Sequence, residues 1–215
     1  MLLNPAMMRR GPKMEKPVLI AATGNPNKIR EIKEILRDAF HVISMKDAGI
    51  TEEAEENGRT FEENALIKAR FVSTRTGQAA IADDSGLEVD ALGGAPGVYS
   101  ARYAGMHGDD EANNRLLLSN LKDIEPPRTG RYVCAIALVR PGKPDLCCRG
   151  TCEGEILQEY RGTGGFGYDP LFLCETGETF AEISMESKNK ISHRKRAIEG
   201  LLRLLKNEAE AKPKA

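Results

Sequence analysis

The stretch that most constrains this chain runs from Ala80 to Gly105 and reads AIADDSGLEVDALGGAPGVYSARYAG. A short apolar run over residues 79–82, typical of a buried strand, ends at two adjacent carboxylates, Asp83 and Asp84, followed by a Ser-Gly turn. Paired carboxylates at the end of a buried strand can hold a hard divalent cation or activate a water molecule. The alternative is an Asx-turn that only closes the strand. This stretch alone does not decide between the two.

Helical and strand patterns are mixed along the rest of the chain, which predicts an α/β fold with a mixed sheet. Further strands are expected over four apolar runs, at 18–22, 132–139, 146–156 and 171–173. The turn at 140–144 favours antiparallel pairing of the second and third of these. Helices are expected over 26–40, from the Thr60–Glu63 capping box onward, over 109–122, and after Ser192.

Composition narrows the classes of partner. The 215 residues carry a net charge of -1, whereas a duplex-binding protein usually has a large basic excess, so no nucleic-acid partner is predicted. No apolar run approaches the roughly 20 residues of a membrane span, so no membrane partner is predicted. The five cysteines form no C-x-x-C pair, which favours a reducing, cytoplasmic setting. We expect a flexible extension over 1–16, one domain over 17–206 and a frayed tail over 207–215.

The run TGNPNK, residues 23–28, follows the first predicted strand. Asn25 suits a helix N-cap and Pro26 suits the first helical position. Backbone N–H groups at a helix start bind anions, Gly24 permits close approach, and Lys28 adds a positive charge. The run has neither the Walker nor the dinucleotide glycine pattern, so an ordinary strand-to-helix turn is the alternative.

Two later runs also carry candidate ligand groups. The glycine-rich loop 162–170 offers the rings of Phe166 and Tyr168 and the acceptor Asp169, a set suited to an aromatic ring held by stacking and an edge hydrogen bond. The alternative is a hairpin loop whose aromatic residues close the core. In the run KNKISHRKR, His193 and Arg194 lie at a predicted helix start, where the dipole disfavours cations, so an anionic or carbonyl-bearing ligand is indicated. A solvated helix start is the alternative there.

In this order, these runs resemble the non-canonical purine nucleoside triphosphate pyrophosphatases, the dITP/XTP branch of the inosine triphosphate pyrophosphatase superfamily. The matching runs are ATGNPNK (22–28), TFEENALIKA (60–69), the 80–105 stretch, GTGGFGYDPLF (162–172) and SHR (192–194). The resemblance implies Mg²⁺-dependent hydrolysis of ITP, dITP and XTP to the monophosphate and pyrophosphate. It also implies an elongated α/β fold, with a mixed sheet, flanking helices and two lobes around a central active-site cleft, and a homodimer.

The resemblance also implies roles for individual residues. Asp84 is the expected catalytic residue and a metal ligand, and Lys28 and Lys68 face the phosphates. As a hypothesis of mechanism, Asp84 or its neighbour Asp83 deprotonates the attacking water. A second metal ligand is expected in the acidic loop 51–57, where Glu55 and Glu56 compete and the spacing to Gly58 favours Glu55. The expected substrate contacts are Thr23, Gly24, Asn25, Pro26, Asn27, Lys28, Ser85, Phe166, Gly167, Tyr168, Asp169, Lys188, His193 and Arg194.

Two other functions fit the same residues. One is a related pyrophosphatase for another modified or canonical nucleotide. The other is a non-catalytic nucleotide sensor, although binding alone does not need paired carboxylates.

Overall fold

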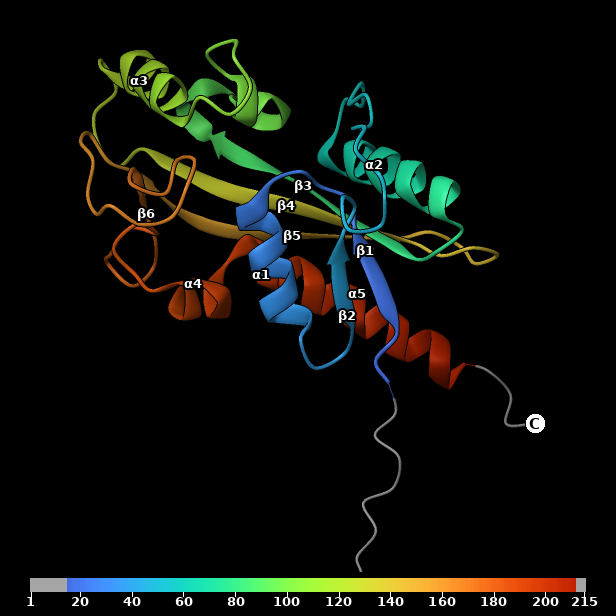
Figure 1. Ribbon diagram of the computed structural model, residues 1–215. Helices are drawn as coiled ribbons and strands as arrows, with labels where there is room; N and C mark the ends of the chain where they lie inside the picture. The colour runs from blue at the N-terminus through green and yellow to red at the C-terminus, as the bar shows by residue number, and fades with distance from the viewer. Residues whose placement is uncertain (1–14, 212–215) are drawn as a thin grey trace, which may run out of the picture.

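A six-stranded mixed sheet forms the centre of the molecule, in the order β2-β1-β3-β4-β5-β6 (Figure 1). The computed structural model describes residues 15–211. Strand β1 (Val18–Ala21) pairs in parallel with β2 (His41–Ser44) and β3 (Ala80–Val89). The next three pairs are antiparallel: β3 with β4 (Thr129–Val139), β4 with β5 (Leu146–Ile156), and β5 with β6 (Phe172–Leu173). The predicted mixed α/β fold and the predicted β4–β5 hairpin are therefore confirmed.

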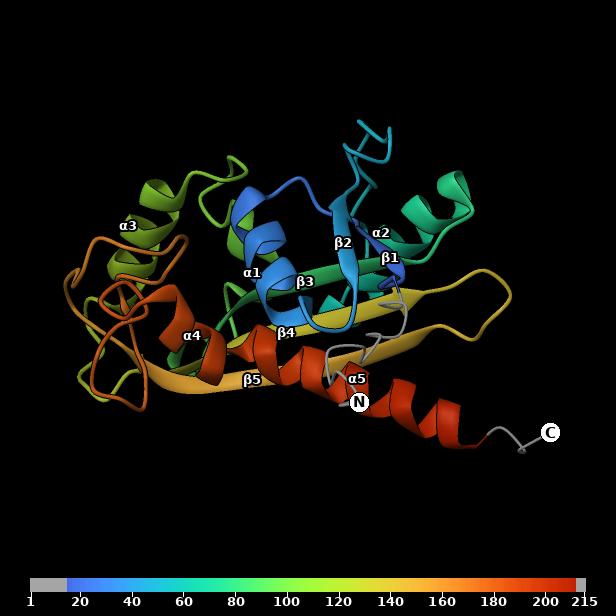
Figure 2. The same cartoon turned by 60° about the horizontal axis from the view of Figure 1, so that its bottom comes forward.

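Helices flank both faces of this sheet. They are α1 (Pro26–Leu36), α2 (Phe61–Thr76), α3 (Asp110–Leu121), α4 (Met185–Ile191) and α5 (His193–Glu210), with short 3₁₀ turns η1 (Asp90–Leu92) and η2 (Gly97–Arg102). Figure 1 shows α2 and α3 on one side of the long strands, while Figure 2 shows α5 along β4 and β5 on the other. No helix in the described part of the chain is long and apolar enough to cross a membrane.

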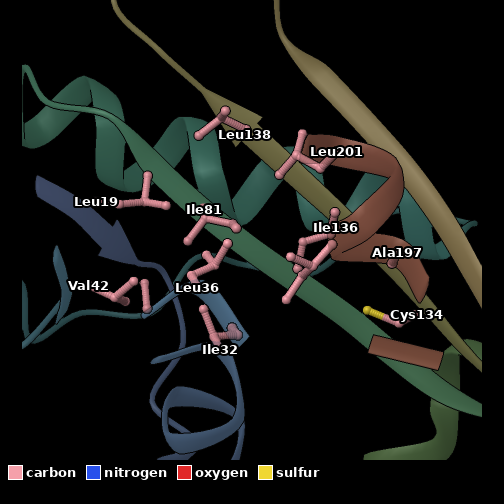
Figure 3. Packing of buried hydrophobic residues seen from close by; sticks show 12 residues of the cluster. Leu19, Ile32, Leu36, Val42, Ile81, Cys134, Ile136, Leu138, Ala197 and Leu201 are labelled. Atoms are coloured by element: carbon pink, nitrogen blue, oxygen red, sulfur yellow. The ribbon is translucent and has the colours of Figure 1, made fainter. Parts of the chain in front are cut away.

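Three apolar clusters hold these layers together. Side chains of α1 and α5 pack on one sheet face against Ile81 and Ile136 (Figure 3), and α2 packs on the opposite face against Ala82 and Ala135. A third cluster lies where α3 and the segment 168–180 meet the far end of the long strands. Burial of this apolar surface is the main contribution to stability. Gly150 lets α5 approach β5 closely, because a Cβ there would overlap the carbonyl of His193.

Strand β3 does not end at the two carboxylates, so that prediction was wrong. Its parallel pairing with β1 stops at Ile81, but its antiparallel pairing with β4 continues through Asp83 and Asp84 to Val89. The longer partner β4 satisfies the backbone of the polar residues, which keeps them in the strand. Since side chains alternate along a strand, the two aspartates point to opposite faces of the sheet.

The helix boundaries mostly agree with the sequence. Asn25 caps α1, and the Thr60 hydroxyl accepts from the N–H of Glu63 at 3.1 Å. The reciprocal half of the capping box is shifted by one residue, because the Glu63 carboxylate accepts from the N–H of Arg59. Helix α4 was not predicted, and α5 continues to Glu210, so residues 207–210 are helical rather than frayed. Residues 1–14 of the expected extension and 212–215 of the expected tail lie outside the described residues.

Candidate active site

Two adjoining pockets lie over β3 beyond the end of β1. They share Asn25, Lys28, Ser85, Ala101 and His107 and so form one cleft. The carboxylate pocket, as we call the first, is also lined by Thr23, Gly24, Glu53, Glu56, Lys68 and Asp84. The aromatic pocket, the second, is also lined by Asp110, Tyr132, Phe166, Gly167, Tyr168, Asp169, Lys188, His193 and Arg194. The cleft thus brings together most residues expected to bind substrate, whereas Pro26, Asn27, Glu55 and Asp83 do not line it.

Hydrogen bonds from its own side chains hold the turn before α1. The Asn25 side-chain oxygen accepts from the N–H groups of Asn27 and Lys28, at 2.9 and 3.2 Å. The Thr23 hydroxyl accepts from the N–H of Asn25 at 3.2 Å. These helix-start N–H groups are therefore already occupied, and the positive charge that this turn offers the cleft comes from the Lys28 ammonium group.

Asp84 faces the carboxylate pocket from β3. Its Oδ1 lies 2.7 Å from Nζ of Lys68, which also lies 3.2 Å from Oε1 of Glu56. Asn64, also on α2, donates to Oδ2 of Asp84 at 3.3 Å. Burial raises the pKa of Asp84 above its ordinary value, and the charges of Lys68 and Lys28 only partly offset this. Lys68 thus pairs with two carboxylates that come from different parts of the fold and leaves a net negative charge among the three groups.

The structure does not support the choice of Glu55 as the second acidic ligand. Glu55 is exposed and does not line the cleft, whereas Glu56 is half-buried and reaches Lys68. Neighbouring residues of the loop point in different directions, so the spacing to Gly58 alone could not separate them. Glu53 of the same loop also lines the carboxylate pocket, and its side chain packs against Gly24.

Asp83 lies on the opposite face of β3 and is fully buried. It contacts Lys28 at 2.8 Å, and Nε and Nη2 of Arg194 each lie 2.9 Å from its Oδ2. Burial alone would raise the pKa of Asp83, but Arg194 and Lys28 hold it well below its usual range. A buried carboxylate that holds its charge so strongly is a poor base for water. The alternative that Asp83 deprotonates water is therefore not supported, and its contacts position Lys28 and Arg194.

This buried ion pair extends into a longer network below the aromatic pocket. Arg194 also pairs with Glu31 of α1 and donates to Ser85 at 3.1 Å. Glu31 lies 3.5 Å from Lys188, which in turn pairs with Asp169. Burial opposes ionisation of Glu31, yet Arg194 and Lys188 lower its pKa below the ordinary value. Charges from four separated parts of the chain thus compensate one another.

The aromatic pocket differs in two details from the expectation. Tyr168 is buried, and its hydroxyl donates to the carbonyl of Ser100 at 2.8 Å, so it closes the core instead of offering a free ring face. Asp169 already accepts from Tyr132, Lys188 and the N–H of Phe166. Phe166 is the half-buried ring that remains, with Nζ of Lys188 4.7 Å from its centroid.

His193 forms part of the pocket wall rather than an exposed donor. Its ring is buried and stacks on Tyr132, with centroids 4.8 Å apart and planes 10° apart. Burial, and then the charges of Arg194 and Lys188, lower the pKa of His193 well below its usual range. The imidazole is therefore neutral at pH 7 and packs as an aromatic surface.

Sequence reasoning missed several residues that line the cleft or support it from behind. Glu31 and Asn64 are polar positions inside amphipathic helices, and their inward direction becomes visible only once the helix faces are placed on the sheet. Tyr132 appeared as one residue of an apolar strand. Glu56 competes with Glu55 in the sequence, where the spacing to Gly58 alone favours Glu55.

Residues 19–204 match the model of the Ham1 family. This chain belongs to the Ham1 family. A dITP/XTP pyrophosphatase of Bacillus subtilis is 51% identical over 189 residues, which cover 86% of this chain and 96% of that protein. A protein of the same name from Shigella flexneri is 47% identical, with 90% of this chain and 100% of that protein covered.

Solved Ham1 structures share the fold. The Ham1 protein of Staphylococcus aureus has a TM-score of 0.79 and 42% sequence identity, covering 89% of this chain and 99% of its own. A nucleoside-triphosphatase, or dITP/XTP pyrophosphatase, from Mycobacterium abscessus has a TM-score of 0.70 and 44% sequence identity, and the match covers 86% of this chain and 98% of that chain. The sequence-based resemblance is confirmed at the level of family and fold.

Proposed function

We propose that this Ham1 protein hydrolyses non-canonical purine nucleoside triphosphates, namely ITP, dITP and XTP, to the monophosphate and pyrophosphate. The relatives named dITP/XTP pyrophosphatase, at about half identity over most of the chain, support this activity and do not favour the nucleotide sensor or a different substrate class. Such a reaction removes non-canonical nucleotides from the pool from which nucleic acids are made.

The observation that carries the proposal is the division of one cleft into two chemically different halves. The carboxylate pocket combines Asp84, Glu56 and Lys68 with the Lys28 ammonium group, which suits a polyphosphate with a bound cation. The aromatic pocket offers the Phe166 ring and the buried cation Lys188, which suits a purine. The two halves meet at Lys28 and Ser85, so a nucleoside triphosphate laid along the cleft would place its α-phosphate near the junction.

The carboxylate pocket also fits a divalent metal. Asp84 and Glu56 are hard oxygen donors, and the ammonium group of Lys68 lies between them where two carboxylates need positive charge. No cluster of three or more His, Cys, Asp or Glu side chains is formed over residues 15–211, so the proposed ion would need ligands beyond these two side chains. We propose that Asp84 and Glu56 hold Mg²⁺. When bound, this ion would lower the pKa of a water molecule and offset negative charge on the phosphates.

In the proposed mechanism, Asp84 orients a water molecule toward the α-phosphorus and accepts its proton while pyrophosphate leaves. Its carboxylate faces the carboxylate pocket, where it can accept that proton. Asn64 and Lys68 fix the direction of the carboxylate through the two oxygens. Lys28 and Lys68 offset the charge that grows on the leaving pyrophosphate. Asp83 keeps Lys28 in place from below the sheet.

We propose that selectivity depends on the six-position of the purine. Inosine and xanthosine present a carbonyl oxygen there, whereas adenosine presents an amino group. The Lys188 ammonium group has only donors, so it can donate to the carbonyl oxygen but cannot accept from an amino group. The nearby acceptors Asp169 and Glu31 are already paired with Lys188 and do not offer the amino group a free partner. Sites built on such hydrogen bonds discriminate by on the order of 10⁴–10⁵.

The test is a nucleotide panel with pyrophosphate release as the readout, with and without Mg²⁺. We expect rapid Mg²⁺-dependent hydrolysis of ITP, dITP and XTP and slow hydrolysis of ATP. Equal values of kcat/KM for ATP and ITP would contradict the carbonyl-reading account, and binding without release of pyrophosphate would indicate a sensor.

We further propose a cytoplasmic homodimer. All five cysteines are free thiols, which agrees with a reducing compartment. Light scattering of the purified protein tests the dimer, and a molar mass equal to the 23.6 kDa of one chain would contradict it.

A further inference from the structure

Helix α3 holds one residue of the glycine-rich loop by both of its backbone polar groups. Oδ2 of Asp110 accepts from the N–H of Gly167 at 2.6 Å, and Nδ2 of Asn114 donates to the Gly167 carbonyl at 2.9 Å. The two side chains are four residues apart on α3 and therefore lie on the same side of it. Gly167 has a φ of 63°, a conformation that favours glycine.

The residues on either side of Gly167 are those that build the aromatic pocket. Phe166 supplies its half-buried ring, and two residues on, Asp169 anchors the Lys188 ammonium group. Asp169 also accepts from the N–H of Phe166 at 2.9 Å, which links these two residues across Gly167. A shift of Gly167 would therefore displace the stacking surface and the purine-facing cation together.

The loop needs an external anchor because of its composition. Gly162, Gly164, Gly165 and Gly167 all lie within six residues, and each glycine loses more conformational freedom on ordering than any other residue. Outside the lining of the cleft, the N–H of Gly164 donates to the carbonyl of Ala181. On the cleft side, Asp110 and Asn114 are the side chains that hold the backbone of Gly167.

Asn114 shows that this anchor has a cost. The residue is only 3% exposed, and its side-chain oxygen Oδ1 is buried without a hydrogen-bond partner. Leaving a buried acceptor unpaired is unfavourable, whereas an apolar side chain of similar shape would avoid the penalty. The donor on the same amide is the group that reaches Gly167.

We propose that Asp110 and Asn114 are positioning residues for purine recognition, which act by fixing Gly167 and through it Phe166 and Lys188. This inference rests on the proposed function, because it concerns the same cleft. Neither residue lines the carboxylate pocket. Losing the anchor therefore weakens binding of the base, while polyphosphate binding and the hydrolytic step are retained.

Asp110→Ala tests this directly, because Asp110 is exposed and its loss leaves the core intact. We expect KM for ITP to rise about tenfold, in line with the loss of one charge-assisted hydrogen bond, with kcat nearly unchanged. Inhibition by inorganic tripolyphosphate is expected to stay at the wild-type level. Asp110→Asn keeps an acceptor oxygen and is expected to restore a low KM. The matched control is Glu111→Ala. Glu111 lies in the same helical turn, and its carboxylate pairs with Arg115 on the surface.

A second variant, Asn114→Leu, removes the donor and the unpaired oxygen together. Calorimetric titration with IMP is expected to show weaker binding for Asp110→Ala and Asn114→Leu, with tripolyphosphate binding unchanged. The inference is overturned if Asp110→Ala behaves like Glu111→Ala, or if tripolyphosphate binding weakens in parallel with IMP binding. Failure of the wild-type protein to hydrolyse ITP would instead refute the proposed function, and the two titrations would still report on the anchor.

Discussion

The buried arginine of the ion network gives the sharpest stability prediction. Arg194 is 1% exposed and contacts Asp83, Glu31 and Ser85. Arg194→Leu leaves two buried carboxylates without their main cation, a change that typically costs about 3–5 kcal/mol. At roughly 2–4 °C per kcal/mol for a domain of this size, Tm should fall by about 6–20 °C. The assay is thermal unfolding at pH 7, followed by circular dichroism.

Arg196→Leu on the same helix is the matched control. Its guanidinium donates to the carbonyl of Thr151 at the surface, so this substitution should lower the free energy of unfolding by about 1 kcal/mol or less. Equal Tm values for the two variants would refute the account of the network.

The pH dependence of Tm follows from the lowered pKa values of Asp83 and Glu31. In the wild-type protein, their ion pairs contribute stability above the unfolded-state pKa values near 4, and this stability is lost as pH falls further. In Arg194→Leu, burial without the cation raises both pKa values, so the carboxyl groups take up protons at a higher pH. The difference in Tm between wild type and variant should therefore shrink from pH 7 to pH 5. A difference that stays constant over this range would contradict the argument.

Three further predictions concern the cleft. Asp84→Asn should lower kcat for ITP by a few orders of magnitude while inhibition by tripolyphosphate persists, and near-normal turnover would remove Asp84 from the mechanism. Glu56→Gln should raise the Mg²⁺ concentration needed for half-maximal activity about tenfold or more, whereas Glu55→Gln should leave it unchanged; the reverse result would restore Glu55 as the ligand. Phe166→Leu should raise KM for ITP by about tenfold, since base–aromatic stacking contributes about 1–3 kcal/mol, and an unchanged KM would show that the purine does not stack there.

Local sequence signals predicted the elements that carry the cleft. Asn25-Pro26 located the start of α1, Thr60 the start of α2 and Ser192 the start of α5, because capping chemistry is readable in a few consecutive residues. The resemblance of whole motifs then placed Asp84, Lys68 and Lys188 in one site, and the structure brings all three to the cleft.

The remaining features depend on partners distant in the chain. Asp83 and Asp84 looked like one pair, but the continuation of β3 along β4 sends them to opposite faces. Asp169 looked like a free acceptor until Tyr132 and Lys188 were found to occupy it. The choice between Glu55 and Glu56 depended on the path of an irregular loop, which no periodic pattern describes. Such contacts are set by tertiary packing and cannot be read from local spacing.

Hydrolysis of ITP in ¹⁸O-labelled water tests the central claim most directly. If water attacks the α-phosphorus in the cleft, mass spectrometry should find the label in IMP and none in pyrophosphate, with one pyrophosphate for each IMP. Label in the pyrophosphate, or release of orthophosphate with IDP, would contradict the account.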